Sequence, residues 1–295
     1  MCQDDDAAAL ARDATPVDDA GQSTEQMSSS SRVNNAGHRA PLAHVTLIRH
    51  AQSIANTQRV LQGVANAPLS RRGTKQLKML EEGWRPTDGA TNCYELPAPT
   101  MIVSSPIGRA LETAHAVARA TGFSDAVDAT DHLSESLEPK KLQCGSMPHV
   151  VLDSGLCERN FGKMESTRRG LRAPGFSVPM NIGSAESDDN FNSRAAYHGG
   201  KWVDWAAEQG QAGETPHVVL VSHGQWINAF LSAIMPHLRD GTWTHYIKSA
   251  NTALFTIGVH AAQHELLLSN DTRHLTSVTP PAKLSHKRRA QPQHT

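Results

Sequence analysis

The chain has 295 residues, a formal net charge of −1 and four cysteines. The near-zero charge argues against nucleic acid or an acidic membrane as the main partner, and no apolar run approaches the ~18 residues of a membrane span. The cysteines lack CxxC spacing, which favours free thiols in a reducing compartment over a disulfide framework or a zinc site.

Both ends of the chain differ in composition from its centre. Residues 1–43 contain no aromatic residue and more acidic than basic side chains, so we expect a disordered tail. A folded domain is expected at 44–278, followed by a flexible basic tail at 279–295. We expect a cytoplasmic protein, and the cluster Lys287-Arg288-Arg289 leaves a nuclear address as the alternative.

Strand-like and helical stretches alternate between the tails. The first half has a strand at 45–49, a helix from the cap Ser70 to about Glu82, and a strand at 100–104. A helix follows, with Ser105 as its cap, Pro106 at its first position and Gly122 as its end. The second half has a helix at about 191–208, a strand at 217–221 with a helix after it, and strands at 253–259 and 265–269. This alternation predicts an α/β fold of three layers, α/β/α, around a mainly parallel sheet. The Gly-, Pro- and Ser-rich stretch 133–190 is predicted as an irregular insertion with some helix, over the C-terminal edge of the strands.

Chemically versatile residues follow three of the predicted strands. Arg49 and His50 come directly after the first, Arg109 lies in the first turn of the helix after the second, and His223 and Gly224 follow the third. Open α/β sheets bind their ligands at this edge. A guanidinium group binds two oxygens of one phosphate, and neutral imidazole can attack phosphorus. Because fixed positive charge opposes a bound cation, the cluster predicts phosphoryl transfer through a histidine without a metal.

Five segments, in the same order, resemble the histidine phosphatase superfamily, also called the phosphoglycerate mutase-like family. Arg49-His50-Ala51 resembles its Arg-His-Gly signature, and QGVANAPLSRRGTKQL, which begins at Gln62, resembles its QGxxDxPLTxxGxxQ pattern. SSPIGRALETA contains Arg109, LCERNFGKMES contains Glu158, and the late SHG contains His223. The resemblance runs from about Val45 to Asn270.

The resemblance implies a role for each matching residue. The catalytic residues would be His50 as nucleophile, Glu158 as proton donor and His223. The phosphate-binding residues would be Arg49, Asn56, Arg109 and Gly224, and Gln62 and Gly63 would contact substrate. Glu165 competes with Glu158 for the role of proton donor. No metal or cofactor is implied, and the expected partner is a small phosphorylated substrate or a phosphoprotein.

Departures from the family pattern favour a phosphatase over a mutase. Ala51 replaces the usual glycine, and Gln52 stands where the phosphoglycerate mutases have glutamate. Three alternatives remain: a phosphoglycerate mutase, a catalytically silent phosphate-binding scaffold, and a metal-dependent hydrolase that uses His50, His223 and a carboxylate.

Overall fold

The computed structural model describes residues 40–87, 91–127, 149–176, 183–213, 215–236 and 247–276. All helices and strands below lie in the unit that begins at Pro41. Most of the expected N-terminal tail, the expected C-terminal tail, and positions 133–148 and 177–182 of the expected insertion lie outside the described residues.

Within these residues, a seven-stranded sheet has the order β3-β4-β2-β7-β1-β8-β9. The strands are β1 (Ala43–Arg49), β2 (Met101–Ser104), β3 (Ser124–Val127), β4 (His149–Leu152), β7 (His217–Ser222), β8 (Leu254–Val259) and β9 (Glu265–Asp271). The pairs from β3 across to β1 are parallel, whereas β8 runs antiparallel to β1 and β9 antiparallel to β8. The prediction of a mainly parallel sheet is confirmed.

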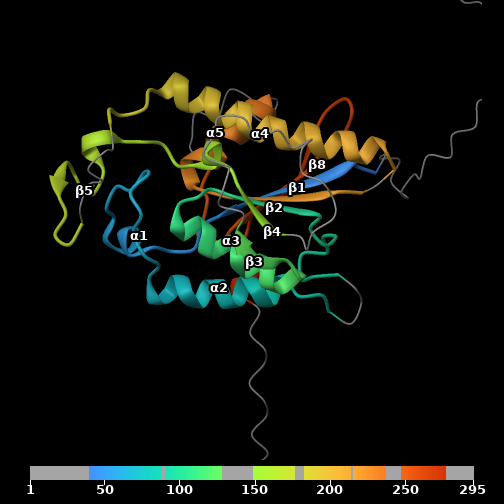
Figure 1. Ribbon diagram of the computed structural model, residues 1–295, viewed down its shortest axis with the longest axis horizontal. Coiled ribbons are helices and arrows are strands. Elements are labelled where there is room, and N and C mark those ends of the chain that lie inside the picture. Colours follow the sequence, from blue (N-terminus) through green and yellow to red (C-terminus); the bar gives the residue numbers. More distant parts are fainter. Residues whose placement is uncertain are drawn as a thin grey trace, which may run out of the picture. The chain divides into compact units, whose positions relative to one another are not determined.

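Helices cover both faces of this sheet (Figure 1). The helices are α1 (Ile54–Gln58), α2 (Arg71–Trp84), α3 (Gly108–Thr121), α4 (Asp188–Gln211) and α5 (Gly224–Ile234). α2 packs with α3 on one face, and α4 packs with α5 on the other. The predicted three-layer α/β/α arrangement is confirmed, and within the described ranges no helix is both long and apolar enough to cross a membrane.

The apolar strands explain why both faces need a helical layer. Successive residues of a strand point to opposite faces, so Leu47 joins the core under α4 and α5 while Ile48 joins the core against α2 and α3. On β7, Val218 and Val219 divide in the same way. β1 and β7 are central strands that are buried from both sides, as is typical of parallel sheets.

The helix boundaries test the capping predictions. Ser70 caps α2, with its hydroxyl 3.0 Å from the Gly73 amide, and Gly122 ends α3 in the left-handed conformation at φ 80°. The cap predicted at Ser105 is wrong, because α3 begins at Gly108 with Ile107 as its N-cap. The Ser105 amide still donates to a carbonyl of β7, so the chain has not left the sheet at that point.

The stretch 149–190 is more regular than predicted at its start. His149–Leu152 forms β4, which pairs with β2 in parallel, so the prediction of an irregular insertion is wrong there: this short apolar run joins the sheet. Irregular structure follows, with 3-10 turns at Ser154–Leu156 and Gly162–Met164 and a small hairpin of β5 (Thr167–Arg168) and β6 (Leu171–Arg172). α4 begins at Asp188, with Ser187 as its cap, and is longer at both ends than the predicted helix.

Candidate active site

Two buried histidines lie together where β1 and β7 end. The parallel register pairs Arg49 with Ser222, and the His50 amide donates to the Ser222 carbonyl at 2.9 Å. The imidazole rings of His50 and His223 have centroids 5.2 Å apart and are tilted by 55°. The side-by-side strands therefore bring together residues that are far apart in the sequence.

The hydrogen bonds of His50 define the state of its ring. Nδ1 lies 2.7 Å from the carbonyl oxygen of Ala51, which only accepts, so Nδ1 carries the proton and Nε2 has a lone pair. The Nε–H of Arg109 donates to that Nε2 at 3.3 Å. Burial, followed by the charges of Arg109 and Arg49, holds the pKa of His50 well below its usual value. His50 is therefore neutral, with its available nitrogen facing a guanidinium group.

Arg109 is held by the loop that follows α1. This side chain, 1% exposed, donates to the carbonyl oxygens of Ala65 at 2.8 Å and Gly63 at 2.7 Å. Burial lowers its pKa to about 10, which still leaves it charged at neutral pH. A Cβ at position 63 would lie 2.1 Å from the Arg159 carbonyl oxygen, so only glycine permits this approach. Gly63 shapes the site through its backbone.

Arg49 and Asn56 are positioned by the segment before β8. The guanidinium group of Arg49 donates to the carbonyl of Ser249. Asn251 Nδ2 donates to the carbonyl of His50 at 3.0 Å and to Oδ1 of Asn56 at 3.3 Å. Asn56 Oδ1 also accepts from the Ser53 amide in a capping box at the start of α1. These contacts engage the oxygen of the Asn56 amide and keep its nitrogen as the donor that a phosphate would require.

His223 lies between β7 and α5 and is fully buried. Its Nε2 lies 2.9 Å from the Ser105 hydroxyl at the end of β2. Burial, followed by the charges of Arg109, His50, Arg49 and Arg194, holds its pKa well below the usual value, so this ring too is neutral.

Glu158 is held at the first turn of α5. Its Oε2 accepts from the Gln225 amide at 3.2 Å and its Oε1 from the Arg159 amide at 3.0 Å. The side chain is 7% exposed. Burial raises its pKa, although the two amides and the nearby Arg109 and Arg49 oppose the rise. Gly224, the first residue of α5, lies between His223 and the residue whose amide binds this carboxylate.

The competing carboxylate, Glu165, has a structural arrangement. It is fully buried and accepts three backbone hydrogen bonds: from Ala65 at 2.6 Å, Val64 at 3.0 Å and Phe161 at 3.1 Å. These amides belong to the loop that holds Arg109 and to the segment after Glu158. Glu165 thus joins two loops.

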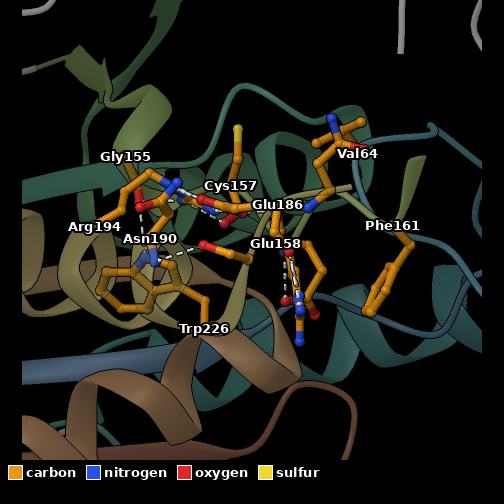
Figure 2. Close-up of polar contacts among 12 residues, drawn as sticks. Val64, Gly155, Cys157, Glu158, Phe161, Glu186, Asn190, Arg194 and Trp226 are labelled. Atoms are coloured by element: carbon orange, nitrogen blue, oxygen red, sulfur yellow. Dashed lines mark hydrogen bonds and ion pairs between the residues drawn. The ribbon is translucent and has the colours of Figure 1, made fainter. Parts of the chain in front are cut away.

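Arg194 of α4 fixes the backbone around Glu158, as Figure 2 shows. Its guanidinium group donates to the carbonyls of Gly155 at 2.8 Å and Cys157 at 2.9 Å. Glu186 receives two hydrogen bonds from the same guanidinium group, each of 2.9 Å, which is the strong bidentate geometry. The sequence analysis missed Arg194, Asn251 and the Ser105–His223 contact, because each joins segments that are distant in the chain.

Gln62 serves here as a loop contact. Its Oε1 accepts from the Ser53 hydroxyl at 3.0 Å, which ties the loop of Gly63 to the start of α1. The structure therefore brings five of the predicted site residues to one edge of the sheet: His50, His223, Arg49, Arg109 and Glu158. The other four lie in the segments next to them: Asn56, Gln62, Gly63 and Gly224.

Known proteins resemble this chain in sequence or in fold. Among curated proteins, probable phosphoglycerate mutase GpmB of Klebsiella pneumoniae is 26% identical over 194 residues, which cover 66% of this chain and 75% of that protein. A mycobacterial glucosyl-3-phosphoglycerate phosphatase has a similar structure, with a TM-score of 0.54 at 21% identity over 78% of this chain and all of the other (100%). Phosphoserine phosphatase of Entamoeba histolytica gives a TM-score of 0.52 at 20% identity, over 79% of this chain and 99% of the other.

The family comparison covers nearly all of the described domain. The sequence profile described as histidine phosphatase superfamily (branch 1) matches residues 45–272. That range includes both histidines, both arginines and Glu158. The chain belongs to the histidine phosphatase superfamily, branch 1.

Proposed function

We propose that this protein is a metal-independent phosphomonoesterase that works through a phosphohistidine at His50. The observation that carries the proposal is the state of the His50 ring, whose Nδ1 proton is engaged by the Ala51 carbonyl and whose Nε2 lone pair faces Arg109. A neutral imidazole of this kind is a competent nucleophile. The surrounding cations suit a phosphoryl group, whose charge is spread over its equatorial oxygens in the transition state.

In the first step, Nε2 of His50 attacks phosphorus while the ester P–O bond breaks. The protonated carboxyl of Glu158 gives its proton to the leaving alkoxide, a role that the raised pKa of this group supports. The imidazole becomes positively charged when the N–P bond forms, and the Ala51 carbonyl that accepts from Nδ1 stabilises that charge. Arg49, Arg109 and His223 would bind the phosphoryl oxygens, with Asn56 as a neutral donor.

In the second step, water attacks the phosphorus of the phosphohistidine. Glu158, now a carboxylate, takes a proton from the water, and the P–N bond breaks to release inorganic phosphate and neutral His50. The same carboxyl group acts first as acid and then as base. No step of this scheme requires a metal ion.

The test is phosphate release from a panel of phosphomonoesters, with a chelator present. His50→Ala is expected to lower release by at least about 1,000-fold. His44→Ala, on the same strand but at its other end, is the matched control and is expected to retain turnover. Acid-labile phosphate should form on the wild-type chain and be absent from His50→Ala. Release that survives in His50→Ala would refute the proposal, and release that a chelator abolishes would favour a metal-dependent hydrolase.

The similarity to a probable phosphoglycerate mutase supports a second candidate, a mutase that shares the first step and returns the phosphoryl group to the product. Ala51 and Gln52 favour the phosphatase. The panel therefore includes 3-phosphoglycerate, with 2-phosphoglycerate followed separately. Isomerisation without release would make the protein a mutase, and phosphate binding without turnover would make it a scaffold.

A further inference from the structure

We propose that Ser105 is a positioning residue that sets the tautomer of His223. Its hydroxyl donates to Nε2, so the ring keeps its single proton on Nδ1, from which it donates to a phosphoryl oxygen. The inference rests on the proposed function, since a phosphoryl group supplies the acceptor for Nδ1.

Ser105 is fixed before any ligand arrives. It follows β2, its amide donates to the Val221 carbonyl at 3.0 Å, and its side chain is fully buried. The neighbouring strand β7 ends at His223, whose Nε2 lies 2.9 Å from the hydroxyl oxygen. Because both residues are fixed by adjacent strands, this hydrogen bond is a preformed part of the sheet edge.

The second observation concerns the other ring nitrogen of His223. Nδ1 is buried and has no hydrogen-bond partner among the described residues. A buried polar atom without a partner costs about 1–3 kcal/mol, so such atoms call for an explanation. The charged groups that influence this ring most are Arg109, Arg49 and Arg194, with His50 beside it. All of these groups disfavour a doubly protonated ring, and the charges of the arginines favour an anion beside it.

The hydroxyl of Ser105 has one proton and two neighbours that could accept it. His223 Nε2 lies at 2.9 Å and the sulfur of Cys157 at 3.7 Å. A thiol sulfur is a weak acceptor, so the nitrogen is the favoured partner. The Ile107 amide donates to the Ser105 oxygen at 3.3 Å and already occupies one of its lone pairs. With Nε2 accepting from Ser105, the proton of the neutral ring must lie on Nδ1.

The opposite tautomer would oppose the reaction. A proton on Nε2 would leave the Nδ1 lone pair facing the oxygens of a bound phosphate, and two acceptors repel each other. The Ser105 hydrogen bond thus converts a buried, neutral imidazole into a donor for an anion without adding a charge to a site that already contains two arginines.

The experiment measures the tautomer directly. Full-length protein is labelled with ¹⁵N-histidine, and the shifts and proton couplings of the ring nitrogens are recorded with and without inorganic phosphate. The His223 signals are assigned by their loss in His223→Gln. We expect the proton on Nδ1 in the wild type, a shift toward Nε2 in Ser105→Ala, and recovery of Nδ1–H in Ser105→Thr, which keeps the hydroxyl. Ser105→Ala should also weaken phosphate binding and lower kcat, each by roughly 10-fold, as expected for one hydrogen bond.

Two control variants address local packing. Ser104→Ala removes an equally buried hydroxyl that donates to the Ser105 carbonyl at 2.8 Å, and Cys157→Ala removes the competing acceptor. Both are expected to keep the proton on Nδ1. A proton on Nε2 in the wild type, or a tautomer that does not respond to Ser105→Ala, overturns the proposal.

The tautomer can be read without turnover, so the two proposals fail separately. If phosphate release survives in His50→Ala and the tautomer of His223 changes in Ser105→Ala, the phosphohistidine route is refuted and the positioning role of Ser105 is retained. An intact phosphohistidine route with the proton on Nε2 refutes the positioning alone.

Discussion

Strand β7 has a buried histidine at its first position and another directly after its last. At the N-terminal end, His217 has both ring nitrogens engaged: Nδ1 with the Pro97 carbonyl at 2.7 Å and Nε2 with the Thr46 hydroxyl at 2.8 Å. Burial lowers its pKa to about 4. At the other end, His223 has one engaged nitrogen and one without a partner among the described residues.

The two histidines show that burial alone lowers a histidine pKa, whereas a binding site also requires charged neighbours and a ring nitrogen that a ligand can use. Both rings are fully buried, and burial is the main cause of the lowered pKa at each. What distinguishes the C-terminal end is the pair of arginines around the rings and the ring nitrogens that remain available to a ligand. A lowered histidine pKa therefore marks burial, and unsatisfied hydrogen-bonding capacity next to fixed charge marks function.

The largest expected effect contrasts two buried glutamates. Glu158→Gln removes the proton donor and should lower kcat/KM, which reports the first step alone, for alkyl phosphates by about 100- to 10,000-fold. The loss should be much smaller for an aryl phosphate such as p-nitrophenyl phosphate, whose leaving group needs no proton. Glu165→Gln, in contrast, should lower the unfolding temperature without a dependence on the leaving group. Kinetics across a leaving-group series check this; equal losses for both ester types in Glu158→Gln would reject its role as the acid.

The next effect compares the two histidines of β7 themselves. His223→Gln should lower kcat/KM by about 100-fold, the scale of one lost transition-state donor, with little change in stability. His217→Gln should keep kcat within about twofold and lower the unfolding free energy by about 1–3 kcal/mol, because its partners lose their hydrogen bonds. Steady-state kinetics and urea unfolding of both variants test the contrast. A reversed pattern would mean that the two ends of the strand are wrongly assigned.

A smaller effect is expected at the support of Glu158. Arg194→Lys keeps the charge but loses the bidentate contact with Glu186 and part of the contact with the carbonyls of Gly155 and Cys157. A lysine cannot replace this fork, so kcat should fall by about 10-fold with KM nearly unchanged. Lys201→Arg, on the same helix, is the control. A change in KM alone would place Arg194 in substrate binding instead.

The last prediction concerns acid stability. The folded-state pKa of His217, about 4, lies below the unfolded value of about 6.5, so the unfolded chain takes up a proton first as the pH falls. The stability of the fold is therefore retained above pH 6.5 and lost progressively between 6.5 and 4, by about 2 kcal/mol at pH 5 for this group. Urea unfolding at pH 7.5, 6 and 5 should show a shallower decline in His217→Gln than in the wild type. Equal slopes would contradict the low pKa.

The parts of this molecule that the sequence predicts are those encoded locally. The strands before His50 and His223 are rich in buried, apolar and β-branched residues, and each is followed directly by its functional residue. Gly122 ends its helix because a left-handed position favours glycine. The prediction of a cap at Ser105 failed for a non-local reason: Ser-Pro is a good helix start, but Ser105 donates a hydrogen bond to the neighbouring strand β7, and the helix begins only at Gly108.

What the sequence did not predict depends on contacts between distant segments. In the sequence, Arg194 is an ordinary helix residue. Its role depends on α4 packing beside the segment that carries Glu158. Asn251 becomes significant because β8 runs antiparallel to β1 and brings its preceding loop to the His50 carbonyl. The strand at His149–Leu152 is difficult to predict because Gly- and Ser-rich residues surround its three consecutive apolar residues.

The hydrogen bond from Arg109 to His50 has a consequence for chemical selectivity. The lone pair of the buried nucleophile is covered by an N–H of a guanidinium group that two carbonyls hold in place. A neutral electrophile offers that N–H no replacement partner, whereas a phosphoryl group brings its own anionic oxygens. Neutral histidine reagents should therefore modify His50 slowly, so the resting protein is protected against the very reagents that usually inactivate nucleophilic histidines.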